Sequence, residues 1–244
     1  MNMARETDGV FISLLHHAAQ SEEDKAVLGK LVFVRKTCPA HTDIATDGDE
    51  RDRTFIVRNG WTVLYRLLSN GERQIIDFPI AGDVISLHAA KHGVQPSFMA
   101  LTEATVLEIS TVSLITAASR SRHLADVLFA ESARQRAILV EHLFNLGRRS
   151  ALSRVAHLLL EIGTRLNMVG LAGPDSYECP LTQYDLADAL GLTAIHVNRM
   201  LRELRRSDLL HFHKSSVGLL DRKLLATIAG FAPSYLRRDI LQDE

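Results

Sequence analysis

The stretch LTQYDLADALGLTAIHVNRMLRELRRSDLL, residues 181–210, has the pattern of two helices joined by a tight turn. The first helix carries Leu186 and Leu190 on one face, and Gly191 ends it as a C-cap glycine would. Thr193 is placed to cap the second helix. That helix would bury an apolar stripe at the spacing i, i+3, i+4, i+7, formed by Val197, Met200, Leu201 and Leu204.

The opposite face of the second helix is polar and rich in arginine. It carries Ile195, Asn198, Arg199, Arg202 and Arg206. A short helix, a glycine turn and a second helix with such an outer face predict a DNA-reading helix-turn-helix. The segment LLHFHKSSVGLL, residues 209–220, then reads as a hairpin of two short apolar strands. With a preceding helix over residues 150–167, this hairpin completes a winged helix.

A different pattern covers residues 31–110. Short apolar, β-branched and aromatic runs such as TFIVR and WTVLYRLL favour strands. Asn59-Gly60 and Asn70-Gly71 are strong hairpin signals. Glycine recurs every eleven or twelve residues, at Gly48, Gly60, Gly71, Gly82 and Gly93. This region therefore predicts an antiparallel β-roll or jelly roll, preceded by helical segments over residues 10–30 with a helix start at Ser21.

Residues 121–147 contain no proline and no internal glycine, which predicts one long helix. A four-three alternation within it is typical of a two-helix seam and comprises Leu128, Ser132, Gln135, Leu139, His142 and Leu146. We expect this seam to join two copies of the chain, and the alternative is a helix buried against the β-roll. Farther along, GLAGPDSYECP, residues 170–180, is expected to be a loop.

The composition is that of a globular protein of 244 residues, 46% of them hydrophobic and 23% charged. The net charge is only −1, so affinity for nucleic acid must come from a local basic face. Cys38 and Cys179 stand far apart, which excludes a disulfide framework or a zinc knuckle and favours the cytoplasm. We find no apolar run long enough to span a membrane, and the N-terminus does not have the pattern of a signal peptide.

The order of a β-roll, a long helix and a winged helix resembles the Crp/Fnr superfamily of bacterial transcription regulators. The resemblance covers most of the chain and is most specific at residues 181–210, in length, glycine position and apolar spacing. NGERQIIDFPIAGDVI, residues 70–85, is similar to the family's strand–turn–strand run ending in Gly-Asp. The resemblance implies an α+β fold in three parts. These are a cyclic-nucleotide-binding-like sensor over residues 1–120, a connecting and dimerisation helix over 121–149, and a winged helix-turn-helix over 150–244.

The resemblance also implies a function. A chain of this kind is a cytoplasmic transcription regulator that binds double-stranded DNA at a palindromic operator as a homodimer. RNA polymerase is a further partner that the resemblance implies. We expect neither enzymatic activity nor membrane association.

Base contacts come from early positions of the second helix in this family, which here are Ala194, Ile195 and Arg199. Arg199 matches an arginine typical of the family, and a bidentate arginine on guanine is the commonest specific contact in the major groove. Ala194 and Ile195 stand where well-known members have arginine and glutamate. They offer only apolar contact, for example with a thymine methyl group, so we expect a half-site that differs from the usual one.

Thr182 and Thr193 are predicted phosphate contacts at helix N-termini, although as plain N-caps they would need no DNA. His196 stands where the family often has a phosphate-contacting threonine, and is interpreted either as a phosphate donor or as an exposed histidine. The complete set of predicted DNA-binding residues is Thr182, Thr193, Ala194, Ile195, His196, Asn198, Arg199, Arg202 and Lys214. The alternative is a solvated helix face on which Glu203 and Asp208 pair with the arginines.

The sensor half lacks the residues that hold cyclic AMP in the family. There, Gly-Glu-Leu follows the Gly-Asp turn, and a downstream arginine pairs with the cyclic phosphate. Here VISLH follows Gly82-Asp83, and residues 74–119 contain no arginine. A buried phosphate would have only Lys91 nearby, and burying that charge unpaired is costly. We therefore expect no cyclic AMP binding of the usual kind, and the sensor ligand stays unidentified.

We expect no cofactor. An iron–sulfur cluster needs four cysteines, and the chain has two. Haem ligated by His88 or His92 is the alternative, because both lie in the pocket region, whereas the plainer interpretation makes them surface-loop histidines. Cys38 is interpreted as structural rather than as a thiol sensor.

A jelly-roll enzyme or metal-binding protein is the competing class of function. It needs clustered histidines and a carboxylate on neighbouring strands. The sheet region has His41, His88 and His92 without His-x-His spacing, and the HFH motif at residues 211–213 lies in the wing. The usual phosphate-loop, hydrolase and metalloprotease motifs are absent, so we expect no catalytic residue and no metal site. A third interpretation keeps DNA binding and makes the β-roll a dimer scaffold without a ligand.

Overall fold

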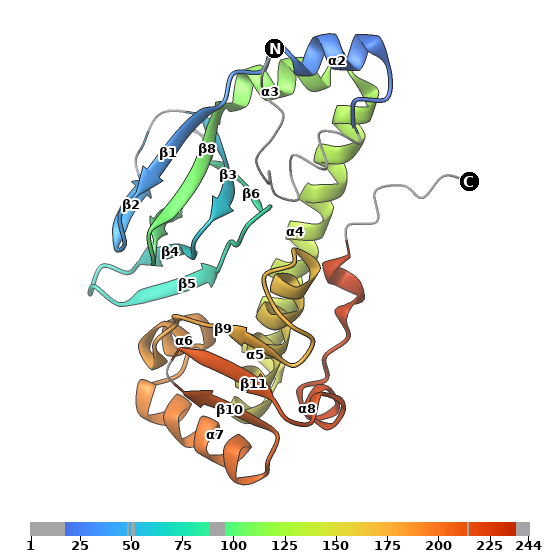
Figure 1. Ribbon diagram of the computed structural model, residues 1–244. Coiled ribbons are helices and arrows are strands. Elements are labelled where there is room, and N and C mark those ends of the chain that lie inside the picture. The colour runs from blue at the N-terminus through green and yellow to red at the C-terminus, as the bar shows by residue number, and fades with distance from the viewer. Residues whose placement is uncertain (1–17, 48, 50–51, 88–95, 214, 238–244) are drawn as a thin grey trace. The chain divides into compact units, whose positions relative to one another are not determined.

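The computed structural model describes residues 18–47, 49, 52–87, 96–213 and 215–237 (Figure 1). The predictions that concern residues 10–17, the glycines Gly48 and Gly93, and the side chains of His88, Lys91, His92 and Lys214 lie outside the described residues. The predicted order of strands, a long helix and a winged helix is confirmed. Among the described helices, none combines the length and the hydropathy needed to cross a membrane.

Two antiparallel β-sheets form the predicted roll, because apolar side chains alternate along its extended strands. One sheet has the order β1-β8-β3-β6 and the other β2-β7-β4-β5. The strands are β1 (Val34–Cys38), β2 (Thr42–Ala45), β3 (Arg53–Asn59), β4 (Thr62–Leu67), β5 (Arg73–Asp77), β6 (Val84–Leu87), β7 (Ser97–Ala100) and β8 (Ala104–Ser110). At the β3–β4 turn, Gly60 has φ 82°, and a side chain there would clash with the backbone of Glu103 and Ala104.

Strand β3 is buried on both faces, and each face belongs to a different apolar cluster. Phe55 and Val57 point into the space between the sheets, where the Phe55 and Phe98 ring centroids lie 5.6 Å apart. Ile56 points the other way and packs with Val27 and apolar side chains of the neighbouring helices. This strand therefore ties the roll to its helical cover, and truncating Phe55 to alanine would cost about 3–5 kcal/mol.

Helix α2 precedes the strands of the roll in the chain, and the other helices follow them (Figure 1). Their bounds are α2 (Glu22–Leu28), α3 (Thr111–Ala118), α4 (Arg122–Arg148), α5 (Ala151–Met168), α6 (Gln183–Leu190), α7 (Ala194–Arg206), α8 (Arg222–Ala229) and the 3-10 helix η2 (Pro233–Leu236). The predicted start of α2 is confirmed, since the Ser21 hydroxyl accepts from the Asp24 N–H at 3.0 Å within a capping box. The long helix expected over residues 121–147 is α4, and the one over 150–167 is α5.

The predicted seam on α4 does not form one exposed face. Leu139 is exposed, but the His142 side chain is directed to the Ile76 carbonyl and the Glu161 carboxylate. The exposed apolar residues of α4 include Phe129, Leu139, Val140, Leu143 and Phe144. The prediction chose the neighbouring stripe because apolar spacing alone does not show which side of a helix the rest of the chain covers.

The C-terminal region contains a three-stranded sheet of order β10-β11-β9, and the predicted wing is its hairpin. The strands are β9 (Ser176–Glu178), β10 (Leu210–His213) and β11 (Ser216–Leu219). The loop prediction for residues 170–180 was wrong at β9, which pairs antiparallel with β11. The three residues of β9 lie between Gly173-Pro174-Asp175 and Cys179-Pro180 and carry little strand signal of their own, so only the distant partner makes them a strand.

The described chain divides into two compact units. The first comprises residues up to Leu64 and Phe78–Ala133, and the second comprises Tyr65–Asp77 and Arg134–Arg237. This division differs from the three segments predicted from the sequence, because it falls inside α4 and assigns β5 to the winged-helix unit. The reason lies in the ion pairs that β5 makes with α5 and α6, described below.

Candidate nucleic-acid interface

The turn between α6 and α7 is built from two threonine caps and one glycine. Thr182 starts α6 with a capping box, in which its hydroxyl accepts from the Asp185 N–H and its own N–H donates to Asp185 Oδ2 at 2.9 Å. Gly191 ends α6 with φ 60°, a left-handed conformation that favours glycine. Thr193 then caps α7 by accepting from the His196 N–H at 3.2 Å. The sequence predicted all three features.

Helix α7 is divided into a buried stripe and an exposed polar face. The stripe consists of Val197, Met200, Leu201 and Leu204, as predicted, and all four are buried. Burying such side chains contributes about 1.5–3 kcal/mol each. The apolar contacts therefore fix which face of α7 points away from the protein.

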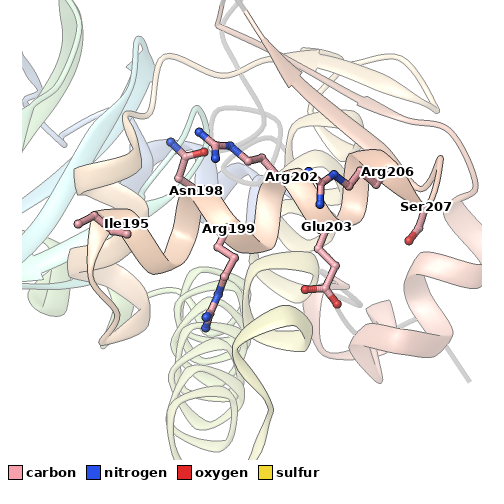
Figure 2. A pocket seen from close by; sticks show the side chains of 7 residues that line it. All are labelled: Ile195, Asn198, Arg199, Arg202, Glu203, Arg206 and Ser207. Atoms are coloured by element: carbon pink, nitrogen blue, oxygen red, sulfur yellow. The ribbon is translucent and has the colours of Figure 1, made fainter.

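The outward face of α7 lines a shallow hollow, shown in Figure 2. Its lining residues are Ile195, Asn198, Arg199, Arg202, Glu203, Arg206 and Ser207. In the part of the chain that the structure describes, Arg199, Arg202 and Arg206 form no ion pair with a carboxylate, nor do Glu203 and Asp208 with an arginine. The structure therefore does not support the alternative in which Glu203 and Asp208 neutralise this face. The arginines present net positive charge to solvent.

The remaining predicted residues lie around this hollow. Thr182 and Thr193 are exposed N-caps, whereas Ala194, His196 and Asn198 are half-buried. Ile195 is 85% exposed, although it is a large aliphatic residue with no packing role at that position. Seven of the nine predicted residues lie at the start of α6 or in the N-terminal half of α7, Arg202 lies in the C-terminal half of α7, and the ninth, Lys214, lies outside the described residues.

Gln183 belongs to the same surface but was not singled out from the sequence. Its Oε1 accepts a hydrogen bond from Asn198 Nδ2 at 3.0 Å, so that the start of α6 holds a side chain of α7. The two residues are fifteen positions apart, and neither has a pattern that reveals the pairing. The helix-turn-helix pattern, which predicts that α6 and α7 pack against each other, was the signal that could have suggested this hydrogen bond.

Strand β5 is bound to α6 by a double ion pair. Arg73 donates from Nε to Asp188 Oδ2 and from a terminal nitrogen to Asp185 Oδ1, both at 2.7 Å. Asp185 is the same carboxylate that closes the α6 capping box. Arg73, the first residue of β5, therefore connects this strand directly to the first helix of the helix-turn-helix.

A buried network joins β5 to α4 and α5. Arg165 donates to Asp77 Oδ1 at 2.8 Å and lies 3.3 Å from Glu161 Oε1, which also bonds His142 Nε2 at 2.9 Å. Tyr235 donates to the other oxygen of Glu161 at 2.8 Å. The carboxylate of Glu161 is fully buried and has three partners. Buried charges of this kind persist only when they are paired and hydrogen-bonded.

The pKa values of this network follow from its contacts. Burial lowers the pKa of His142, but the charge and hydrogen bond of Glu161 raise it more, to about 9. Burial raises the pKa of Glu161, but His142, Arg165 and Tyr235 together lower it to about 2. His142 is therefore protonated and Glu161 ionised at neutral pH, and they form a charged pair.

Asp77, His142 and Glu161 also have the spacing of a metal site, because each offers a ligand atom and these atoms lie within 4.8 Å of one another. The Arg165 guanidinium argues against a metal ion here, because it already bonds both of the carboxylates that would be ligands. With Arg165 and protonated His142, the two negative charges are neutralised. These residues consequently form an ion-pair network, and they do not fit a metal centre.

Two family models match separate parts of the chain. The cyclic nucleotide-binding domain matches residues 35–121, and the Crp-like helix-turn-helix domain matches residues 153–228. The nitrogen fixation regulation protein FixK of Rhizobium meliloti is 31% identical over 170 residues, which are 69% of this chain and 74% of FixK. The fumarate and nitrate reduction regulatory protein of Vibrio cholerae is 25% identical over 212 residues, covering 86% of this chain and 84% of its own.

Solved structures give the same result. FixK2 from Bradyrhizobium japonicum superposes with a TM-score of 0.73 at 29% identity, over 83% of this chain and all of that one. A CooA variant from Carboxydothermus hydrogenoformans has a TM-score of 0.70 at 18% identity, over 92% of this chain and 98% of its own, which shows a shared fold. From its sequence matches and its winged helix-turn-helix, we conclude that the chain belongs to the Crp/Fnr family of transcription regulators.

Proposed function

We propose that the protein is a cytoplasmic homodimer that binds a palindromic operator through α7 and regulates transcription in contact with RNA polymerase, without catalysing a reaction. Each subunit inserts α7 into a major groove, and the two half-sites lie roughly 34–36 Å apart. The contacts come from the nine predicted residues, which are Thr182, Thr193, Ala194, Ile195, His196, Asn198, Arg199, Arg202 and Lys214.

One observation supports this function most strongly, and it is the unneutralised arginine face of α7. Arg199 and Arg202 extend from a helix whose other side is fully packed, and no described carboxylate pairs with them. Phosphates and guanine edges are the partners that guanidinium groups fit bidentately. Thr182 and Thr193 add helix N-termini, whose N–H groups attract phosphate.

The apolar face of α4 supports the homodimer. Leu143 is 71% exposed, and Leu139, Val140 and Phe144 are exposed beside it. The positions 129, 132, 136, 139 and 143 repeat a three-four spacing, which is that of a seam between two helices. We commit to a second copy of this chain as the partner, because the exposed apolar residues follow the spacing of a two-helix seam and the resemblance to the Crp/Fnr family implies a homodimer.

Replacing one seam residue tests the dimer. Leu143→Glu should shift the protein from dimer to monomer in sedimentation velocity and weaken operator binding in parallel, because two charges would meet in an apolar interface. Ile115→Glu is the matched control, since Ile115 is 58% exposed on α3. A Leu143→Glu protein that stays dimeric would contradict the α4 interface.

The sensor half is proposed to bind a ligand other than cyclic AMP, or none. Strand β3 carries two arginines, and one of them, Arg53, is buried and paired with Asp49 and Glu108, so its guanidinium is not available to a cyclic phosphate. Titration calorimetry with cyclic AMP should give no saturable heat. A saturable signal in the micromolar range would overturn this part of the proposal.

A ligand signal is proposed to reach α7 through the connecting helices. A shift of these helices would change the spacing of the two reading helices, and only a spacing that matches the DNA repeat binds well. The bonds of β5 to α5 and α6, made by Asp77 and Arg73, support this route because they connect a strand of the roll with the helix-turn-helix.

Selection of binding sites from random double-stranded DNA tests the function as a whole. The purified full-length protein should enrich one palindrome with half-sites about one helical turn apart. It should bind that site at least a thousand-fold more tightly than scrambled DNA. Equal affinity for both DNAs would refute a sequence-specific regulator.

A further inference from the structure

The hydrogen bond between Gln183 and Asn198 has a consequence for base reading. Asn198 lies one residue before Arg199 on α7 and lines the same hollow (Figure 2). Its Nδ2 donates to Gln183 Oε1 at 3.0 Å, which fixes the orientation of the Asn198 amide. The Asn198 side chain is half-buried and is one of the residues that line the hollow.

The fixed amide retains two groups for another partner. An asparagine side chain has two N–H donors and one carbonyl oxygen. Gln183 takes one donor, which leaves the other N–H and Oδ1 of the Asn198 amide for a further partner. Adenine presents the complementary pair in the major groove, with N7 as acceptor and the N6 amino group as donor. Guanine presents two acceptors there, N7 and O6. One of them would face the acceptor Oδ1, and no hydrogen bond could form between them.

We propose that Asn198 reads an adenine in the operator half-site, next to the base read by Arg199, and that Gln183 is a positioning residue that holds Asn198 in the reading orientation. The inference rests on the proposed function, because it assigns one base contact within the same interface. It goes beyond it by naming a base and by giving a role to Gln183.

A purely structural interpretation of the same bond makes different predictions. If the bond only ties α6 to α7, removing it changes stability and lowers the affinity for every DNA sequence equally. If the bond orients a base-reading amide, removing it changes the preference at one base position. The two interpretations are therefore separated by the ratio of affinities for two DNAs, measured with one preparation of each protein. A partly unfolded preparation affects both affinities equally.

The test begins with the site that the full-length parent protein selects from random DNA. Each adenine of the half-site is replaced in turn, and affinities are measured by fluorescence anisotropy. Asn198→Ala should lose about 5- to 150-fold in affinity for the selected site and almost nothing for the DNA that lacks the adenine it reads. The preference of this variant at that one position should therefore vanish.

Two Gln183 variants test the positioning role. Gln183→Glu keeps an oxygen that accepts from Asn198 Nδ2, so the adenine preference should remain while affinity for all DNA falls, because a carboxylate is placed near phosphates. Gln183→Leu removes the acceptor and should lower the adenine preference toward that of Asn198→Ala.

The outcomes that would overturn the inference are distinct from those that concern the function. If Asn198→Ala lowers the affinity for every DNA by the same factor and keeps every base preference, Asn198 reads no base. Gln183→Leu with an unchanged adenine preference removes Gln183 from the assignment. A parent protein that enriches no sequence at all would instead overturn the proposed function, and the inference with it.

Discussion

Two groups of arginines in the same compact unit have opposite surroundings. Arg73 and Arg165 each bond two carboxylates, and Arg165 is almost fully buried. Arg199 and Arg202 are exposed on α7 and, among the described residues, have no acidic partner. The first pair is satisfied within the chain, whereas the second can be satisfied by an anion that the protein does not supply.

This difference separates arginines that hold the fold from arginines that we propose to bind DNA. A buried ion pair adds little net stability over a well-packed apolar pair, but removing one partner leaves a buried charge and is strongly destabilising. An exposed arginine without a partner contributes little to stability. Equivalent substitutions in the two groups should therefore affect different measurements.

The largest effect is expected for Arg165→Met. It leaves Asp77 and the buried Glu161 without their guanidinium partner, so the free energy of unfolding should fall by about 3–5 kcal/mol. Urea unfolding followed by circular dichroism measures this change. Arg202→Met is the matched control and should change stability by less than about 0.5 kcal/mol. Similar losses for both variants would remove the distinction between the two groups.

The next effect concerns the pH dependence of stability. The pKa of His142 is about 9 in the folded protein, against an ordinary value of 6.5. A raised pKa means that the stabilisation is complete below pH 6.5 and is lost as the pH rises through 9, by about 3 kcal/mol in total. This range also avoids His157, because burial lowers its pKa to about 4.

His142→Gln should remove this loss. The difference in unfolding free energy between parent and variant should be largest near pH 6.5 and should shrink toward pH 9, because the parent loses its charged pair with Glu161 there. His211→Gln, at an exposed position in the wing, serves as the control. A difference that stays constant from pH 6.5 to 9 would show that the His142 charge does not contribute.

Arg199→Ala should affect DNA and not the fold. We expect a loss of about 1–3 kcal/mol on the selected site and a relaxed preference at one base position, because a bidentate contact to a base edge is removed. Stability in urea should stay close to that of the parent. Arg120→Ala, an exposed arginine on the other compact unit, controls for charge alone. Parent-like discrimination between selected and scrambled DNA would contradict the role of Arg199.

The smallest effect is expected for Arg202→Ala. If Arg202 contacts a phosphate, the substitution should lower affinity for all sequences about equally and should reduce the slope of log affinity against log salt concentration by about one. Binding measured at several salt concentrations, with specific and scrambled DNA, gives both quantities. A change confined to one base position would instead make Arg202 a base-reading residue.

The sequence predicted the features that repeat locally. Gly191, Thr193 and the stripe from Val197 to Leu204 lie within a few residues of one another, and helix periodicity and capping act over that range. Predictions from the sequence were wrong where a local structure depends on residues that are distant in the chain. β9 is a strand only because β11 lies beside it, and His142 turns inward only because Glu161 and β5 are there.

The sequence by itself therefore determined the helix-turn-helix and the outer face of α7, because both follow from spacing along one helix. Only the tertiary structure decided which arginines are paired. Arg73 meets its carboxylates from more than a hundred residues away, and Arg165 meets Asp77 from eighty-eight. Coulomb attraction depends on distance in space and on exclusion of water, and neither can be read from position in the chain. Arg199 and Arg202, which have no acidic partner among the described residues, are the arginines that we propose to contact DNA.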